Sequence, residues 1–164
     1  MTGDALPPLV VMGVSASGKS AVGEQLADRL GVAYVDADDL HPQANVDKMS
    51  AGIPLDDADR WPWLDAVAAR LAGGPVVIAC SALKRAYRDR LRQAAPETVF
   101  VHLTGDRAVL EDRIADREGH FMPASLLQSQ LDTLEDLSSD EAGFTLDFAE
   151  PVDALVDEAV ERIR

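Results

Sequence analysis

Residues 13–20 of the chain read Gly-Val-Ser-Ala-Ser-Gly-Lys-Ser and fit the pattern G-x-x-x-x-G-K-[ST] in full. The glycines let the backbone turn tightly and bring its N–H groups close to an anion, and the N-terminus of a following helix adds a positive dipole end. Lys19 can then reach the β- and γ-phosphates of a nucleotide, and Ser20 can ligate Mg²⁺. We therefore expect a nucleoside triphosphate to bind through Gly13, Ser15, Ala16, Ser17, Gly18, Lys19 and Ser20.

The segments on either side of this loop have the pattern that a phosphate-binding loop needs. Residues 9–12 are an apolar run that predicts a strand. The helix after the loop carries Val22, Leu26 and Leu30 at a spacing of four, and Gly31 ends it. This order of strand, turn and helix favours nucleotide binding, but it does not say what the nucleotide does.

Two acids follow the next expected strand, residues 32–35. Side chains alternate along an extended chain, so Asp36 and Asp38 would lie on the same side of it, at the end of a strand where parallel sheets bind ligands. We expect Asp36 to hold Mg²⁺ through water and Asp38 to orient or deprotonate an attacking hydroxyl. The alternative is that these acids cap a helical segment at residues 40–42.

The position of these acids separates three classes of nucleotide-binding protein. A GTPase needs the guanine-reading pattern N-K-x-D, and residues 45–48 have those residue types in the wrong order. A motor ATPase usually has an acid at the end of a later apolar strand, whereas residues 76–79 run into Cys80 and Ser81. A kinase needs a second substrate site beside the phosphate loop, and the acids after the second strand suit one. The sequence therefore favours a small kinase.

Basic residues are the candidates for binding the second substrate, because they stand out in an acidic chain. Lys84 and Arg88 fall in the first turns of an expected helix, where the macrodipole disfavours cations by roughly 0.3–1 kcal/mol each. We expect them to bind an anion there. The alternative is that they belong to a solvent-exposed basic face of the helix and pair with surface acids. His41, Lys48 and Arg60 are weaker candidates when each is taken alone.

Two further arginines, Arg113 and Arg117, repeat the spacing of four on a later helix that is expected to end at Gly119. Such arginines can belong to a mobile lid that closes on the transferred phosphoryl group and excludes water. We expect this lid at about residues 117–137. The alternative is ordinary pairing, one turn apart, with the neighbouring acids Glu111, Asp112 and Asp116.

Strands and helices alternate along the rest of the chain. We expect further strands at residues 75–80, 99–103 and 145–148, and helices at residues 42–51, 56–71, 84–95, 106–118, 123–134 and 152–163. This alternation implies right-handed crossovers and a parallel sheet covered on both faces. We therefore predict a three-layer α/β/α P-loop kinase fold with about five strands, in a single domain of residues 1–164.

Composition limits the partners and the location. The net charge of −14 argues against a nucleic-acid backbone as partner, because binding phosphates in a row needs clustered cations. The apolar runs are far shorter than a membrane span, and residues 1–8 lack the basic and apolar regions of a signal peptide. A single cysteine, Cys80, excludes an internal disulfide. We expect a cytoplasmic protein without nucleic-acid or membrane partners.

The combination and order of these residues resemble a known family, the gluconate kinases (gluconokinases). They are small P-loop kinases related in fold to shikimate and nucleoside monophosphate kinases. The matching stretches are residues 12–20, 38–42, 45, 48–49, 52–55, 57–60, 62–64, 80–84, 87–88 and 119–121. Ala16 departs from the family pattern, which usually has glycine there. We expect little damage from it, provided that its backbone dihedral angles suit alanine.

The resemblance implies transfer of a phosphoryl group from ATP, with Mg²⁺ as cofactor, to the 6-hydroxyl of D-gluconate. A sugar acid of this kind needs cations for its carboxylate and mixed donors and acceptors for its hydroxyls. The implied acceptor-binding residues are Asp38, His41, Lys48, Arg60, Lys84, Arg88 and His120. Lys19 and Arg117 would stabilise charge on the transferred group, and Arg113 would pack on the adenine. Members of the family are often homodimers, although the sequence shows no dimer seam.

Two other interpretations stay open at this point. A shikimate-type or other small-metabolite kinase would use the same loop and the same aspartates with a different acceptor. A regulatory module would bind ATP without transferring its phosphoryl group, and it would keep its function after Asp38→Asn.

Overall fold

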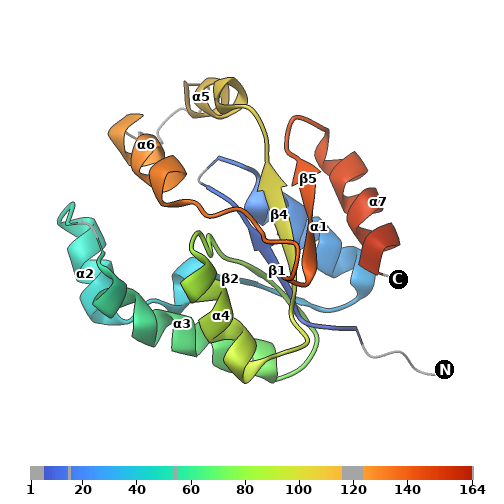
Figure 1. The fold of residues 1–164 in the computed structure, drawn as a ribbon, viewed down its shortest axis with the longest axis horizontal. Helices are drawn as coiled ribbons and strands as arrows, with labels where there is room; N and C mark the ends of the chain where they lie inside the picture. Colours follow the sequence, from blue (N-terminus) through green and yellow to red (C-terminus); the bar gives the residue numbers. More distant parts are fainter. Residues whose placement is uncertain (1–5, 15, 54, 116–123, 164) are drawn as a thin grey trace.

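The computed structural model describes residues 6–14, 16–53, 55–115 and 124–163. Its sheet has five parallel strands in the spatial order β2-β3-β1-β4-β5 (Figure 1). The strands are β1 (Leu9–Met12), β2 (Ala33–Asp36), β3 (Val76–Ala79), β4 (Val99–Thr104) and β5 (Gly143–Asp147).

Helices cover both faces of the sheet. They are α1 (Lys19–Leu30), α2 (Gln43–Ser50), α3 (Asp57–Ala72), α4 (Arg85–Ala94), α5 (Arg107–Ala115), α6 (Ala124–Thr133) and α7 (Val152–Ile163), with a short 3₁₀ helix, η1 (Ala37–Leu40), after β2. α1 and α7 pack on one face, and α3 and α4 pack on the other (Figure 1). The predicted α/β/α fold with five strands is confirmed. Among the residues that the structure describes, none of the helices combines the length and the apolar composition of a membrane span.

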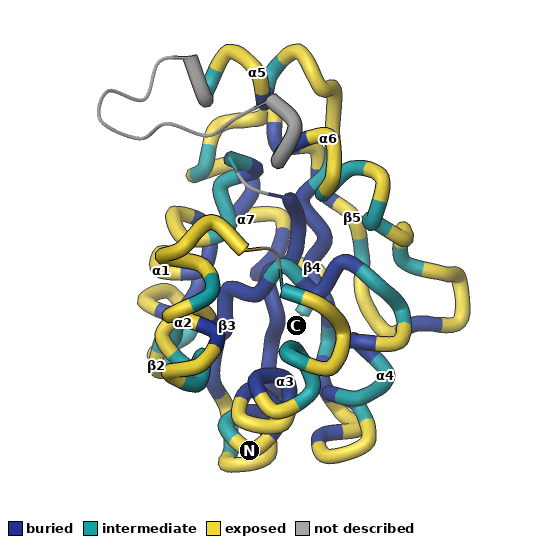
Figure 2. Tube along the Cα trace, turned by 90° about the vertical axis from the view of Figure 1, so that its left-hand side faces the viewer, coloured by how far each residue is buried: buried dark blue, intermediate teal, exposed yellow. Residues whose placement is uncertain are grey.

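The central strand, β1, divides the core into two halves. Leu9 and Val11 pack with apolar residues of α1 and α7, whereas Val10 and Met12 pack with those of α3 and α4. The reason is that successive side chains of a strand point to opposite faces of its sheet. Figure 2 shows β1, β3 and most of β4 in the dark blue of buried residues, inside helices whose outer faces are exposed. A strand buried on both faces needs an unbroken apolar run, and residues 9–12 supply one.

Parallel pairing brings several loops to one edge of the sheet. β1 lies between β3 and β4 and pairs with both in parallel, so the carboxyl ends of these strands lie together. β2 pairs with β3 in the same direction, and Asp36 is opposite Ala79 in its register. The strand order reverses beside β1, and doubly wound sheets bind ligands in the crevice at such a point.

The chain after β2 does not stay extended, so the prediction that Asp36 and Asp38 lie on one side of a strand is wrong. Asp36 ends β2 and caps η1, and its Oδ1 accepts a hydrogen bond of 3.0 Å from the backbone N–H of Asp38. A carboxylate at this position satisfies a backbone donor of the helical turn that would otherwise have no partner within it. The alternative of a helix cap therefore holds for Asp36, although the capped turn is η1.

The other predicted elements agree with the structure to within two residues wherever they are described. β5 begins two residues before the predicted strand because Gly143 pairs with Phe100 of β4. A Cβ atom on Gly143 would lie 2.3 Å from the carbonyl oxygen of Phe100, so only glycine permits this close approach. The predicted end of the helix at residues 106–118 lies outside the described residues, which stop at residue 115 in this region.

Candidate active site

The phosphate loop follows the buried strand β1 directly. A Cβ atom on Gly13 would lie 2.8 Å from the carbonyl oxygen of Leu103, so the chain can pass β4 here only with glycine. Gly18, at φ 97°, is the N-cap of α1. The Lys19 ammonium folds back over the loop and donates hydrogen bonds to the carbonyl oxygens of Gly13 (3.0 Å) and Val14 (3.1 Å). The loop therefore has the local geometry that phosphate binding requires, with its lysine at the loop backbone.

Ala16 adopts a left-handed backbone conformation, with φ at 69°. The condition attached to the sequence prediction is therefore not met, because this conformation costs an L-residue with a Cβ atom roughly 1–2 kcal/mol. The carbonyl oxygen of Ala16 accepts a hydrogen bond of 3.0 Å from Nη1 of Arg113. Contacts of this kind hold the loop in place although alanine strains it.

Replacing Ala16 with glycine is expected to raise the free energy of unfolding by up to about 1 kcal/mol, because the relief of strain exceeds the added entropy of the unfolded chain. Urea unfolding measures the change. Gly31 also lies in the left-handed region, at φ 71°, and a Cβ atom there would meet nothing within 4 Å. The matched control Gly31→Ala should therefore shift stability in the opposite direction. A destabilised Ala16→Gly protein would show that alanine is not strained at this position.

A cavity of about 270 Å³ lies beside the phosphate loop. It is lined by Ala16, Ser17, Gly18, Val22, Arg113, Phe148, Glu150, Val152 and Leu155. Arg113 bridges its two sides, because the guanidinium donates to the carbonyl oxygens of both Ala16 and Phe148 and lies 5.4 Å from the centroid of the Phe148 ring. A cavity with apolar walls and a flat cation next to a phosphate loop can accommodate a nucleoside base.

The acids after β2 are linked electrostatically to the phosphate loop. Asp38 keeps contact with solvent, but the surrounding protein desolvates it and raises the pKa of its carboxyl, and the charge of Asp36 raises this pKa further. The nearby charges of His41 and Lys19 act in the opposite direction. Asp36, Asp38 and His41 lie within six residues of one another at the end of β2, and the charge of Lys19 acts on Asp38 from the phosphate loop. A carboxyl with a raised pKa is a stronger general base, as transfer to a hydroxyl requires.

The side chains predicted to hold Mg²⁺ have suitable chemistry for it. Ser20 is exposed in the first turn of α1, and Asp36 is half-buried at the end of β2. Hydroxyl and carboxylate oxygens are the ligands that Mg²⁺ prefers. Within the part of the chain that the structure describes, no three His, Cys, Asp or Glu side chains gather into a metal cage. Two oxygen donors of this kind suit Mg²⁺, which proteins usually bind through one or two carboxylates together with substrate phosphates and water.

His41 is fixed by two neighbours that the sequence prediction did not assign to the site. Its ring stacks on Trp63, with centroids 4.3 Å apart and planes 13° apart. Asn45 places Nδ2 3.2 Å from His41 Nδ1 and also donates to the carbonyl oxygen of Asp59 at 2.9 Å. Nδ1 thus accepts the amide hydrogen, which leaves the proton of the neutral ring on Nε2. Burial lowers the pKa of His41, and the Arg60 charge lowers it further against the opposing effect of Asp38. His41 is therefore neutral at pH 7.

Arg60 and Lys84 meet at the ring of Tyr87. The guanidinium of Arg60 lies 5.6 Å and the ammonium of Lys84 5.5 Å from the ring centroid, and Arg60 Nη1 donates to the Tyr87 hydroxyl at 3.1 Å. Asp57 Oδ1 accepts from this hydroxyl at 2.5 Å and lies 3.4 Å from Lys84 Nζ. The structure thus brings together two predicted cations, which we call the cation pair, and adds Tyr87 and Asp57. Spacing on α3 and α4 could have indicated them, since each lies three residues from one member of the pair.

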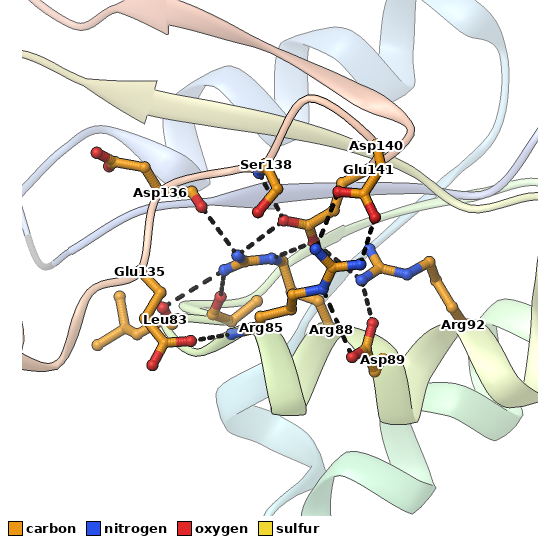
Figure 3. Close-up of polar contacts among 11 residues, drawn as sticks. Leu83, Arg85, Arg88, Asp89, Arg92, Glu135, Asp136, Ser138, Asp140 and Glu141 are labelled. Atoms are coloured by element: carbon orange, nitrogen blue, oxygen red, sulfur yellow. Dashed lines mark hydrogen bonds and ion pairs between the residues drawn. The ribbon is translucent and has the colours of Figure 1, made fainter.

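Arg88 does not join the cation pair, and the expectation that it contacts the acceptor is corrected. Its side chain is fully buried and makes an ion pair with the buried Glu141, at 2.7 Å from Nε to Oε1 (Figure 3). It also donates to the carbonyl oxygens of Ala82, Leu83 and Asp136. The physical reason is that Glu141 approaches α4 from the segment before β5, where its charge offsets the burial of Arg88.

Lys48 joins α2 to α3. Its Nζ donates to both carboxylate oxygens of Asp59, at 2.9 and 2.8 Å. Asp59 in turn forms a capping box with Asp56 at the start of α3. The hydrogen bond from Lys48 lowers the pKa of the Asp59 carboxyl, and the same bond raises the pKa of Lys48. A direct contact of Lys48 with an acceptor therefore stays a prediction. Ser15, Arg117 and His120 lie outside the described residues.

Comparisons with known proteins show the family to which the chain belongs. A family model described as an AAA domain matches residues 9–137. A gluconokinase of Gluconobacter oxydans (strain 621H) is 47% identical over 161 residues, which cover 95% of this chain and 90% of the relative. The crystal structure of a gluconokinase from Sinorhizobium meliloti 1021 has a TM-score of 0.90 at 51% identity and covers 98% of this chain and 93% of its own. A shikimate kinase from Aquifex aeolicus vf5, at a TM-score of 0.60 and 14% identity over 95% of both chains, shares the fold alone.

Proposed function

Because the chain belongs to the gluconokinase family, and its residues 9–137 match the AAA-domain model, we propose that it transfers the γ-phosphoryl group of ATP to the 6-hydroxyl of D-gluconate. The observation that carries the proposal is a continuous series of groups that begins at the phosphate loop and ends at the cation pair. Lys19 lies on the phosphate loop, and Asp38 and His41 follow β2 at the same edge of the sheet. His41 stacks on Trp63 of α3, and Arg60 lies on the same helix three residues earlier. D-Gluconate has a carboxylate at one end and the reacting hydroxyl at the other. The carboxylate suits the cation pair, and the hydroxyl suits Asp38 beside the phosphate loop.

Each group in the series has a distinct role in the proposed reaction. Arg60 and Lys84 bind the carboxylate, which places the 6-hydroxyl toward the phosphate loop. Asp38 orients that hydroxyl and takes its proton, and neutral His41 offers Nε2–H to the acceptor's hydroxyls. Lys19 neutralises charge on the transferred phosphoryl group. Ser20 and Asp36 would hold Mg²⁺, which when bound neutralises charge on the phosphate oxygens.

The lid stays part of the proposal. Arg117 would close on the transferred group and His120 on the acceptor, while Arg113 packs against the nucleoside base. The far end of the proposed lid is attached to the start of α4: the backbone N–H of Glu135 donates to the carbonyl oxygen of Leu83 at 2.7 Å, and Glu135 Oε1 accepts from the backbone N–H of Arg85 at 2.9 Å. Any lid motion would therefore involve residues before 135. We place the reaction in the cytoplasm, where ATP is available.

A coupled assay of ADP release with Mg·ATP tests the function. The acceptors are D-gluconate, shikimate, D-glucose and AMP, with a sample that has no acceptor as the blank. We expect ADP release with D-gluconate alone. ADP release with shikimate instead would support the nucleotide site but show that the acceptor is not D-gluconate. ATP binding without turnover of any acceptor would favour a regulatory module.

Replacing Lys84 with alanine tests the carboxylate site within this reaction. We expect the KM for D-gluconate to rise about tenfold or more, because a charged hydrogen bond contributes roughly 1.5–3 kcal/mol, while the KM for ATP stays unchanged. The matched control is Arg90→Ala, which removes a cation of α4, the helix that Lys84 precedes; Arg90 pairs with Asp65 at 2.8 Å. Equal effects on both Michaelis constants, or none, would place the carboxylate elsewhere.

A further inference from the structure

We propose that Asp57 is a built-in counter-ion that competes with the acceptor's carboxylate for the cation pair and thereby sets how tightly a carboxylate acceptor binds. The inference rests on the proposed function, because it takes Arg60 and Lys84 as the carboxylate site. It assigns to Asp57 a positioning and specificity role that the sequence prediction did not contain.

The contacts of Asp57 differ in quality. Its Oδ1 has a short hydrogen bond of 2.5 Å from the hydroxyl of Tyr87. The two cations lie farther away: Lys84 Nζ is 3.4 Å from Oδ1 and 3.5 Å from Oδ2, and Arg60 Nη1 is 3.7 Å from Oδ1. Charge-assisted hydrogen bonds are usually about 2.7–2.9 Å long, so Asp57 attracts both cations without saturating either. N–H donors of both thus stay available to a second carboxylate.

Tyr87 lets the cation pair keep its place when Asp57 gives way. Its side chain is buried, and Arg60 and Lys84 both lie within 6 Å of its ring centroid. A ring face attracts cations through its quadrupole, independently of any carboxylate. The donor arrangement of the site is therefore maintained by an aromatic ring, while the anion on it can be exchanged.

The local charges also fit an exchange of one carboxylate for another. The hydrogen bond from Tyr87, with the charges of Lys84 and Arg60, holds the pKa of the Asp57 carboxyl below its ordinary value, so Asp57 is ionised at pH 7. Two cations and one carboxylate leave one positive charge, which a single acceptor carboxylate neutralises. The Asp57 side chain is 48% exposed, so water can solvate it when it moves aside.

A simpler role would explain only part of these contacts. Asp57 is the first residue of α3, where an acidic side chain interacts favourably with the helix dipole. That role predicts a small loss of stability after Asp57→Asn and no change in acceptor binding. It gives no reason for Asp57 to lie against two cations of the acceptor site.

The test is a titration followed by tryptophan fluorescence, which needs no phosphoryl transfer. Trp61 reports on the site, because its ring lies edge-on to Tyr87 with centroids 5.7 Å apart. The wild type, Asp57→Asn and Asp57→Ala are titrated with D-gluconate, with shikimate and with the uncharged polyol D-glucitol. The matched control, Asp65→Asn, removes another α3 carboxylate, which pairs with Arg90 instead of the cation pair.

We expect both Asp57 variants to bind D-gluconate about three- to fivefold more tightly, with D-glucitol unaffected and Asp65→Asn like the wild type. In the kinase assay the KM for D-gluconate should fall by the same factor, while the KM for ATP stays constant. Unchanged or weaker carboxylate binding by folded variants would overturn the inference, as would the absence of any carboxylate binding.

The proposed function fails separately. If the wild type binds carboxylates without releasing ADP in the presence of D-gluconate, the acceptor assignment is wrong. The competition by Asp57 is then decided by the fluorescence titrations with D-gluconate and shikimate.

Discussion

Replacing Lys19 with alanine is expected to lower kcat for phosphoryl transfer about 10³-fold, while the protein stays folded. The ammonium lies on the phosphate loop, 3.0 and 3.1 Å from the carbonyl oxygens of Gly13 and Val14, and it is the loop cation that can move onto the β- and γ-phosphates. The free energy of unfolding should fall by about 1–3 kcal/mol, because each of these two partly buried hydrogen bonds contributes about 0.5–1.5 kcal/mol.

The measurement is ADP release at saturating ATP and D-gluconate, combined with urea unfolding of the same samples. Arg29→Ala is the matched control on α1, since Arg29 makes an exposed ion pair with Asp157 far from the loop. It should leave kcat unchanged. A Lys19→Ala protein with more than a tenth of the wild-type kcat would show that the lysine does not stabilise the transferred group.

The largest effect on stability is expected from Glu141→Gln, which should lower the free energy of unfolding by about 3–5 kcal/mol. The variant leaves the Arg88 guanidinium buried without its counter-charge. In the native protein Glu141 supplies that charge (Figure 3), and both side chains are fully buried. Arg92, whose guanidinium lies 2.9 Å from Oε1 of Glu141, would lose the same partner. Replacement of both members of the pair by apolar residues, as in Arg88→Met with Glu141→Leu, should recover much of the loss.

The matched control for this variant is the adjacent residue. Asp140 pairs at 2.7 Å with Arg85, which lies on α4 like Arg88, but the Asp140 side chain is 64% exposed. Asp140→Asn should therefore lower the free energy of unfolding far less than Glu141→Gln does, because exposed ion pairs contribute little. Similar losses of unfolding free energy in Glu141→Gln and Asp140→Asn would show that burial does not make the Arg88–Glu141 pair important for stability.

The same pair makes stability depend on pH. Burial opposes ionisation of Glu141, but hydrogen bonds from Arg88, from the backbone N–H of Ser138 and from Arg92 prevail and hold its pKa at about 2. A pKa that is lower in the folded state stabilises the protein above the ordinary pKa of 4.5, and this stabilisation is lost as pH falls from there toward about 2. The difference in unfolding free energy between the wild type and Glu141→Gln should shrink across this range. Chemical unfolding at a series of pH values would measure it.

The sequence by itself determined the phosphate loop and the elements around it. The conformation of residues 13–20 can be predicted from the residues themselves, since the positive φ at Gly18 and the close approach of the backbone at Gly13 each require glycine. Apolar runs and spacings of four likewise predict the strands and helices, because the direction of side chains repeats with a period set by the local backbone conformation. Ala16 is a partial exception, because the identity of the residue does not reveal that its φ is left-handed.

Only the tertiary structure decided which basic side chains meet. Arg60 and Arg88 have the same chemistry, yet Arg60 lies on Tyr87 at the site while Arg88 lies in the interior against Glu141, 53 residues further along the chain. Pairing over such a separation depends on how β4, β5 and their connections place the later residue in the fold. Periodic patterns in the sequence extend over a few turns of a helix and cannot predict it. The same holds for Asp57, which the sequence shows as one acid among 29, and which the packing of α3 on α4 places between two cations.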